Sequence, residues 1–199
     1  MSYDDQLVAG KLRRWEKYLN EYRLPRWEDI PDLGLYMEQV LVLMREYLDY
    51  LPPELKEEQF LTAATINNYV RNRIMPMPRR KRYYRIHIAY LIMICTLKQS
   101  LSIATLQTMI PMDIPIDEVR RIYDAYAQRH RVTAAYFAQQ IRLVAGPILG
   151  HADTGDELAV HQTSDLIASA AIAAGLSRLL AEKLLLLDGK TLDDDLPIG

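Results

Sequence analysis

The chain has 199 residues, half of them apolar and a quarter charged, which is the composition of a globular protein with one or two hydrophobic cores. Its net charge of −2 excludes a general basic excess, and its single cysteine excludes an intramolecular disulfide bond. The start of the sequence is acidic and polar, unlike a secretory signal peptide, so we expect a cytoplasmic protein.

Positive charge is nevertheless concentrated in one part of the chain. Residues 59–112 hold eight Lys or Arg and no Asp or Glu, whereas residues 1–58 and 113–199 each carry a charge of −5. Because salt screens charges beyond about 10 Å, a polyanion responds to local rather than total charge. This distribution predicts a basic face that can bind nucleic acid.

Two helices are predicted before the basic region. Apolar residues recur at helical spacing over residues 4–22 and again from Leu35 to Leu51, where two prolines end the pattern. The prolines of residues 24–33 predict a turn-rich connector between them, and residues 54–59 predict a charged linker. We expect Trp15 and Trp27 to pack the first helix onto the core.

A short third helix is predicted after Thr62, whose hydroxyl can cap its amino terminus. Its inner face would carry Ile66, Tyr69 and Val70. Its outer face is amide-rich and contains no carboxylate, which suits contacts with base edges and phosphates better than an ordinary solvated surface. The outer residues are Thr65, Asn67, Asn68, Arg71 and Asn72.

Prolines at 76 and 78 block continuation of this helix, and the basic run that follows is long enough for a β-hairpin. Residues 86–97 are apolar nearly all round and predict the buried central helix, in which Cys95 is a core residue. A short helix from Ile103 to Ile110, capped by Ser100 or Ser102, is predicted next.

From Pro115 no glycine or proline occurs until Gly146, so a helix of about 30 residues is predicted. A weak heptad pattern pairs residues 116/119, 123/126, 130/133 and 137/140 and ends at 144. Two interpretations stay open: a dimer-forming coiled coil, or packing within the chain. A second open question is whether aromatic residues of this helix are core residues or line a pocket for a small-molecule effector. These are Tyr123, Tyr126, Tyr136 and Phe137.

Residues 146–164 predict an irregular loop, and Asp165 is expected to cap a final apolar helix. Residues 166–187 could be mistaken for a membrane span, but they include Arg178, Glu182 and Lys183. We therefore expect a buried or dimer-forming helix and no membrane association.

The basic region resembles the MerR-type winged helix-turn-helix domain. The resemblance rests on TINNY at residues 65–69, RIMP at 73–76, Tyr84-Arg85, the apolar helix and LSIATL at 101–106, with Arg73 where that family has glycine. It implies that residues 62–72 form a recognition helix, that residues 78–85 form the wing, and that the long helix after Pro115 mediates dimerisation.

The chain as a whole resembles the family called domain of unknown function 1836, the YkrK-like proteins. The shared features are Leu24-Pro25-x-Trp27, IPDLGLYMEQV at residues 30–40, LTAATINNY at 61–69 and Lys98-Gln99. This resemblance implies a small bacterial transcriptional repressor.

No pattern typical of an enzyme is present. The sequence lacks the histidine, glycine-loop and paired-cysteine motifs of common hydrolases, nucleotide-binding proteins and metal sites, so we expect no catalysis, cofactor or metal. Glu54, Glu57 and Glu58 are better interpreted as a solvated charge run than as metal ligands.

We therefore expect an all-α protein with a small β-hairpin wing, in two parts. Residues 1–112 contain a winged helix-turn-helix core at about 33–112, and residues 113–199 form a helical dimerisation or effector region. The expected function is sequence-specific binding of double-stranded DNA as a homodimeric repressor, with helix 62–73 in the major groove. The expected contact residues are Thr62, Thr65, Asn67, Asn68, Tyr69, Arg71, Asn72, Arg73, Arg79, Arg80, Lys81, Arg82, Tyr84 and Arg85. The alternative is a non-enzymatic adaptor whose basic face binds an acidic protein.

Overall fold

The computed structural model describes residues 3–48, 61–150 and 159–188. Helices account for most of these residues, which confirms the predicted all-α class. They are α1 (Asp5–Glu21), the 3-10 turn η1 (Trp27–Asp29), α2 (Met37–Tyr47), α4 (Ala63–Arg71), α5 (Arg85–Leu97), α6 (Ile103–Met109), α7 (Ile116–Val144), α8 (Gly146–Leu149) and α9 (Thr163–Leu185). The only β-structure in these ranges is two isolated antiparallel bridges.

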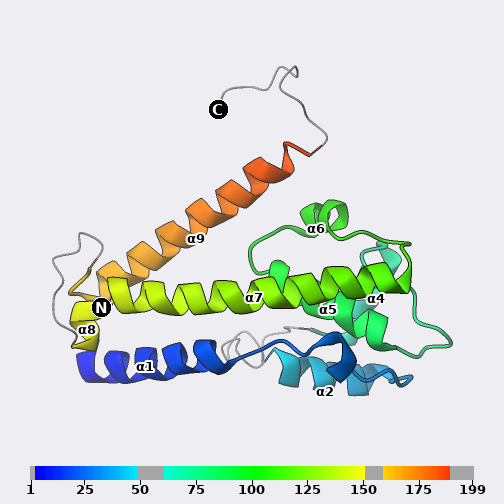
Figure 1. Cartoon of the computed structure of the whole chain (residues 1–199), viewed down its shortest axis with the longest axis horizontal. Coiled ribbons are helices and arrows are strands. Elements are labelled where there is room, and N and C mark those ends of the chain that lie inside the picture. The colour runs from blue at the N-terminus through cyan, green and yellow to red at the C-terminus, as the bar shows by residue number, and fades with distance from the viewer. Residues whose placement is uncertain (1–2, 49–60, 151–158, 189–199) are drawn as a thin grey trace.

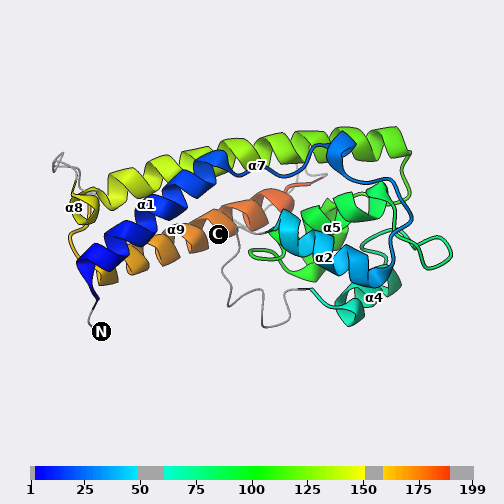
Figure 2. The same ribbon diagram turned by 90° about the horizontal axis from the view of Figure 1, so that it is seen from below.

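The long helix α7 spans the molecule, as predicted from the absence of helix-breaking residues after Pro115. At 1.5 Å per residue its 29 residues extend about 44 Å. Helix α1 lies along its carboxyl-terminal part, and α2, α4 and α5 gather at its amino-terminal end (Figures 1 and 2). Each end of α7 therefore has its own hydrophobic core.

The larger core surrounds α5. Every residue from His87 to Cys95 is buried, and α2, α4 and α7 pack around this helix. A helix without a polar face can be stable in water only when other elements cover all of its sides. Among its neighbours, Val40, Ile66 and Tyr123 are completely buried.

The smaller core joins α1 to the far end of α7. It consists of Ala9, Leu19, Ala138, Ile141, Ala145 and Leu149, and an ion pair between Glu16 and Arg142 closes its edge. In this half of α7 the packing within the chain does not use the predicted heptad positions, because Ala134, Ala138 and Ile141 face inward while Phe137 is 41% exposed, and a dimer seam at those positions stays a prediction. The change of face follows from α1, which packs against α7 beyond its midpoint.

Two buried tyrosines fix the connecting segments to the core. Tyr123 donates a hydrogen bond to the Pro25 carbonyl oxygen (2.7 Å), and Tyr90 donates to the Pro111 carbonyl oxygen (2.7 Å). A buried hydroxyl needs a hydrogen-bond partner, and the carbonyl groups of these two prolines lie outside the helices and can accept. The first bond holds the connector between α1 and α2, and the second holds the loop before α7.

Several predicted details need correction. Trp27 is buried as expected, but Trp15 is 41% exposed and makes only an edge-to-face contact with Phe137. Asp165 lies inside the first turn of α9 rather than at its cap, and the predicted irregular loop contains the short helix α8. The sequence predicts that α9 is buried or dimer-forming. The described residues do not bury it, since its large side chains are mostly exposed, and its role in dimer formation stays a prediction. Residues 51–53 and the linker 54–59 lie outside the described residues.

The central position of α5 predicts a large difference between two leucine substitutions. Leu91→Ala should lower the free energy of unfolding by about 2–5 kcal/mol, because Leu91 is completely buried and its truncation leaves a cavity. Leu33→Ala, at a side chain that is 69% exposed, should change it by less than about 0.5 kcal/mol. Urea unfolding of both variants measures this difference, and equal effects would contradict the described core.

Candidate nucleic-acid interface

Helix α4 begins as predicted. The Thr62 hydroxyl oxygen accepts a hydrogen bond from the Thr65 backbone N–H (3.1 Å), and the two hydroxyl groups lie 2.8 Å apart. Ile66 and Tyr69 are buried, which confirms the predicted inner face. Tyr69 is only 3% exposed, so its side chain cannot reach an external ligand in this structure.

The outer face of α4 carries the amide side chains. Asn68 uses its side-chain oxygen within the helix, accepting hydrogen bonds from Arg71 Nη2 (2.6 Å) and Asn72 Nδ2 (3.1 Å). Asn67 is exposed and makes no side-chain hydrogen bond to the residues that the structure describes. Asn67 is therefore the amide on this face that can offer both its donor and its acceptor to a ligand.

Helix α4 ends in a left-handed residue. The Arg73 backbone has φ +54°, and the Ile74 N–H reaches back to the Tyr69 carbonyl oxygen (2.9 Å). This is the helix-ending geometry that usually requires glycine. An arginine occupies the position instead, and its side chain is exposed.

The predicted hairpin is a tight two-residue turn. The backbones of Arg79 and Arg82 exchange hydrogen bonds of 3.1 and 2.9 Å across Arg80 and Lys81. Both central residues are left-handed, with φ +49° and +60°, as in a type I′ turn. Sequences that favour this turn have Asn-Gly, whereas this chain has Arg-Lys.

A bridge to the start of α2 holds the hairpin in place. Leu35 and Tyr83 exchange backbone hydrogen bonds of 2.8 and 2.9 Å. Arg82 Nη1 donates to the Gly34 carbonyl oxygen (2.8 Å), and its guanidinium lies 3.6 Å above the Tyr36 ring. Gly34 lies tightly against this anchor, because an added Cβ would be 3.2 Å from both Arg82 Cβ and the Tyr84 hydroxyl.

The basic residues therefore divide into two groups. Arg82 is engaged as described, and Arg85 donates from Nε to the Ile30 carbonyl oxygen (2.8 Å), so both hold the hairpin against the connector. Arg79, Arg80 and Lys81 are exposed, and within the described ranges no carboxylate pairs with them. Beside them is an open hollow of about 630 Å³ lined by Gly34, Tyr36, Arg80, Lys81, Arg82 and Tyr84.

Sequence reasoning missed Gly34 and Tyr36 as parts of this surface. Their partner Arg82 lies 46 or more residues further along the chain, and no local pattern connects them. The sequence did predict Thr62, Thr65, Arg82 and Arg85 as ligand contacts. In the structure Thr62 caps α4 and bonds to Thr65 in its first turn, while the two arginines anchor the hairpin.

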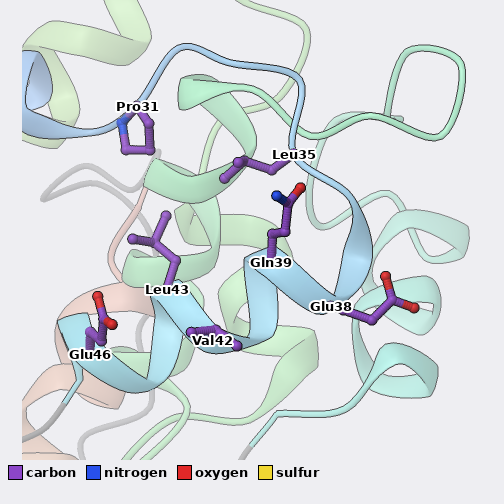
Figure 3. A pocket seen from close by; sticks show the side chains of 7 residues that line it. All are labelled: Pro31, Leu35, Glu38, Gln39, Val42, Leu43 and Glu46. Atoms are coloured by element: carbon purple, nitrogen blue, oxygen red, sulfur yellow. The ribbon is translucent and has the colours of Figure 1, made fainter.

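A second hollow, on the outer face of α2, has different chemistry. It has a volume of about 370 Å³ and an apolar floor that includes Pro31, Leu35 and Val42 (Figure 3). Glu38 and Glu46 lie along its rim. Two carboxylates at the rim repel a phosphate backbone, so this hollow is not part of a nucleic-acid surface.

The structure offers no support for an effector pocket among the aromatic residues of α7. Tyr123 is completely buried, and the Tyr126 hydroxyl bonds to the Thr96 hydroxyl, so both belong to the larger core. Tyr136 and Phe137 are exposed further along the helix.

In the described part of the chain, no group of three or more His, Cys, Asp or Glu side chains could hold a metal ion. Glu54, Glu57 and Glu58 lie outside that part.

His87, the first buried residue of α5, connects the hairpin segment to the core. Its Nδ1 accepts a hydrogen bond from the Tyr84 backbone N–H (2.9 Å). The ring proton must therefore be on Nε2, which donates to the Met77 carbonyl oxygen (3.1 Å). Burial lowers the pKa of His87, and protonation of Nδ1 would also break the bond that caps α5.

This arrangement predicts a pH-dependent stability. Because the pKa of His87 is lower in the folded chain, the unfolded chain binds more protons below about pH 6.5, and the free energy of unfolding falls as pH decreases through this range. His87→Gln keeps an acceptor for the Tyr84 N–H but cannot titrate. Urea unfolding between pH 7.5 and about 5 should show a smaller pH dependence in this variant. Burial also lowers the pKa of His130, so part of the pH dependence should remain in this variant. An unchanged slope in His87→Gln would contradict this role.

Comparison with known proteins gives one match. Residues 25–128, just over half of the chain, match the family model described as domain of unknown function 1836. The matched range includes the hairpin, α4, α5 and the first half of α7. No curated protein and no solved structure matches the chain. The chain therefore belongs to the family of domain of unknown function 1836.

Proposed function

We propose that this chain is a sequence-specific double-stranded DNA-binding transcriptional regulator, a homodimeric repressor of the MerR-like winged helix-turn-helix type. In this proposal α2 and α4 form the helix-turn-helix, with α4 in the major groove. The hairpin at residues 79–82 is the wing and contacts phosphates.

The proposal rests on basic residues that stand at positions where the backbone is strained. Four non-glycine residues in the described ranges have positive φ, and three of them are Arg73, Arg80 and Lys81. A left-handed backbone costs a residue with a side chain roughly 1 kcal/mol relative to glycine. Folding alone would favour glycine or asparagine here, so the basic side chains are kept for another reason. Strain of this kind is typical of binding sites.

The surroundings of these residues fit a polyanion. Arg73 ends α4, and Arg80 and Lys81 form the hairpin tip, so two segments next to each other in the chain carry positive charge that no carboxylate of the described residues pairs with. Between Leu61 and Met112 the chain has no carboxylate that would repel a phosphate backbone. Phosphate contacts of this kind supply most of the affinity of DNA-binding proteins and orient the protein on the duplex.

The exposed residues suggest separate roles. Asn67 is the candidate for reading a base edge, since a free carboxamide can bond in two places to adenine. Asn68 positions Arg71 rather than reaching outward. Arg73, Arg79, Arg80 and Lys81 would contact phosphates, while Arg82 and Arg85 hold the hairpin in place.

A turn replacement separates function from folding. The double variant Arg80→Asn/Lys81→Gly should raise the free energy of unfolding by about 0.5–2 kcal/mol, because Asn-Gly suits a type I′ turn. The same variant should weaken DNA binding and reduce the slope of log K against log salt by about 0.9 per lost phosphate contact. Fluorescence anisotropy between about 50 and 200 mM salt and urea unfolding measure the two effects.

Asp113→Gly is the matched control. Asp113 is the fourth left-handed residue, with φ +58°, but it is acidic and lies in the loop before α7. Its replacement should also stabilise the chain, without weakening DNA binding. If the turn variant gains stability and binds duplexes as tightly as the original chain, the phosphate-binding role of the hairpin is wrong.

Base readout by α4 predicts a different response. Asn67→Ala should relax the preference at particular base pairs by about 1–3 kcal/mol while leaving the salt dependence unchanged. Competition between duplexes that differ at single positions measures this preference. A uniform loss of affinity over all sequences would exclude direct readout by Asn67. Binding to an acidic protein, with no preference among duplexes, would favour the adaptor instead.

A further inference from the structure

Helix α9 is apolar on most of its circumference, yet the described residues leave it largely uncovered. By length and composition it is the one helix in the described ranges that could cross a membrane. Figure 1 shows it diverging from α7. Eight large apolar side chains in and just after it are 47–74% exposed: Ile167, Ile172, Leu176, Leu179, Leu180, Leu184, Leu186 and Leu187. A helix of this kind is stable in water only when something covers it.

The contacts within the chain show which side of α9 is free. Thr163 is buried, Leu166 packs against the smaller core and Ala181 packs against the larger one. At 100° per residue these positions share one side of the helix. The opposite side carries Ala168, Ile172, Gly175, Leu179 and Leu186, which we call the outer stripe of α9.

Large residues recur along the outer stripe at regular spacing. Ile172, Leu179 and Leu186 are seven residues apart; Gly175 lies between the first two, and Ala168 lies one turn before Ile172. A seven-residue repeat of apolar residues is the signature of helix pairing, in which each large side chain packs into a space between residues of the facing helix. A second copy of the chain presents the same spacing.

Gly175 supports close approach by another helix. A glycine inside a helix costs about 1 kcal/mol relative to alanine. Nothing in this chain requires it, because an added Cβ would have no atom within 4 Å. A second helix crossing at this point would need the space.

We infer that the outer stripe of α9 docks against the outer stripe of a second copy of the chain, antiparallel, about a two-fold axis near Gly175. In this arrangement Ile172 of one copy lies opposite Leu179 of the other. The acidic first turn, with Asp165, then approaches the basic Lys183 of the other copy, so the charges at the ends are complementary.

A lipid bilayer is the less suitable occupant. Arg178 pairs with Glu182 (3.4 Å), and Lys183 follows, so three charged residues lie within the last nine residues of the helix. Charges are costly inside a bilayer but acceptable at the edge of a helix pair.

Two isoleucines on opposite sides of α9 provide a matched test. Sedimentation equilibrium of the full chain at micromolar concentration should give a dimer. Ile172→Glu, on the outer stripe, should weaken the dimer by at least about tenfold, because one buried carboxylate per copy costs more than 1.4 kcal/mol. Ile167→Glu changes a residue of similar exposure on the other side and should leave the dimer intact. A monomeric original chain, including one that binds anionic vesicles, or equal effects of the two variants, would overturn the inference.

Cysteine cross-linking tests the orientation. Gly175→Cys, near the two-fold axis, should form a disulfide between copies, whereas Ala168→Cys should not, because residue 168 faces residue 183 of the other copy. A parallel pair would cross-link at both positions and would overturn the antiparallel arrangement. Cys95 is completely buried and does not interfere. The inference rests on the homodimer of the proposed function, but these outcomes do not depend on DNA binding, so a failure here is distinguishable from a failure of DNA recognition.

Discussion

The complete burial of α5 is the constraint on which the rest of the structure depends. The segment from His87 to Cys95 has no side that tolerates water, so α2, α4 and the start of α7 must surround it. All the charged residues between 59 and 112 consequently lie before or after this buried segment. Most of them lie between Arg71 and Arg85, at the end of α4 and in the hairpin that leads into α5. The same constraint that builds the core thus gathers the positive charge in one stretch.

Local strain and charge are linked in this stretch. The backbone of Arg73, Arg80 and Lys81 has the conformation that glycine adopts most easily. With Arg-Lys instead of Asn-Gly at the turn, the chain is less stable but presents exposed cations at fixed positions. The anchoring of Arg82 on Gly34 and Tyr36 and of Arg85 on Ile30 limits the movement of the hairpin, which lowers the entropic cost of binding a ligand there.

Much of the fold follows from local signals in the sequence. Helical spacing and capping residues such as Thr62 and Ser102 place α1, α4, α5, α6 and α7 to within a few residues. The predicted division at residue 112 and the DNA contacts stay predictions. Two features depend on distant partners and have no local signal: the contact of Arg82 with Tyr36 and the inward turn of Ala138 against α1. The composition of α9 is compatible with burial or with dimer formation, and the described residues show that the chain does not bury it.

The central claim is that α4 and the hairpin recognise a particular DNA sequence. Its most direct test is selection of bound duplexes from a random-sequence pool by the purified full-length chain, followed by sequencing of the bound fraction. The account predicts enrichment of a defined motif, arranged as an inverted repeat if the chain binds as a two-fold dimer. A bound fraction with the same sequence composition as the starting pool would contradict it, and would leave the basic surface without a sequence-specific role.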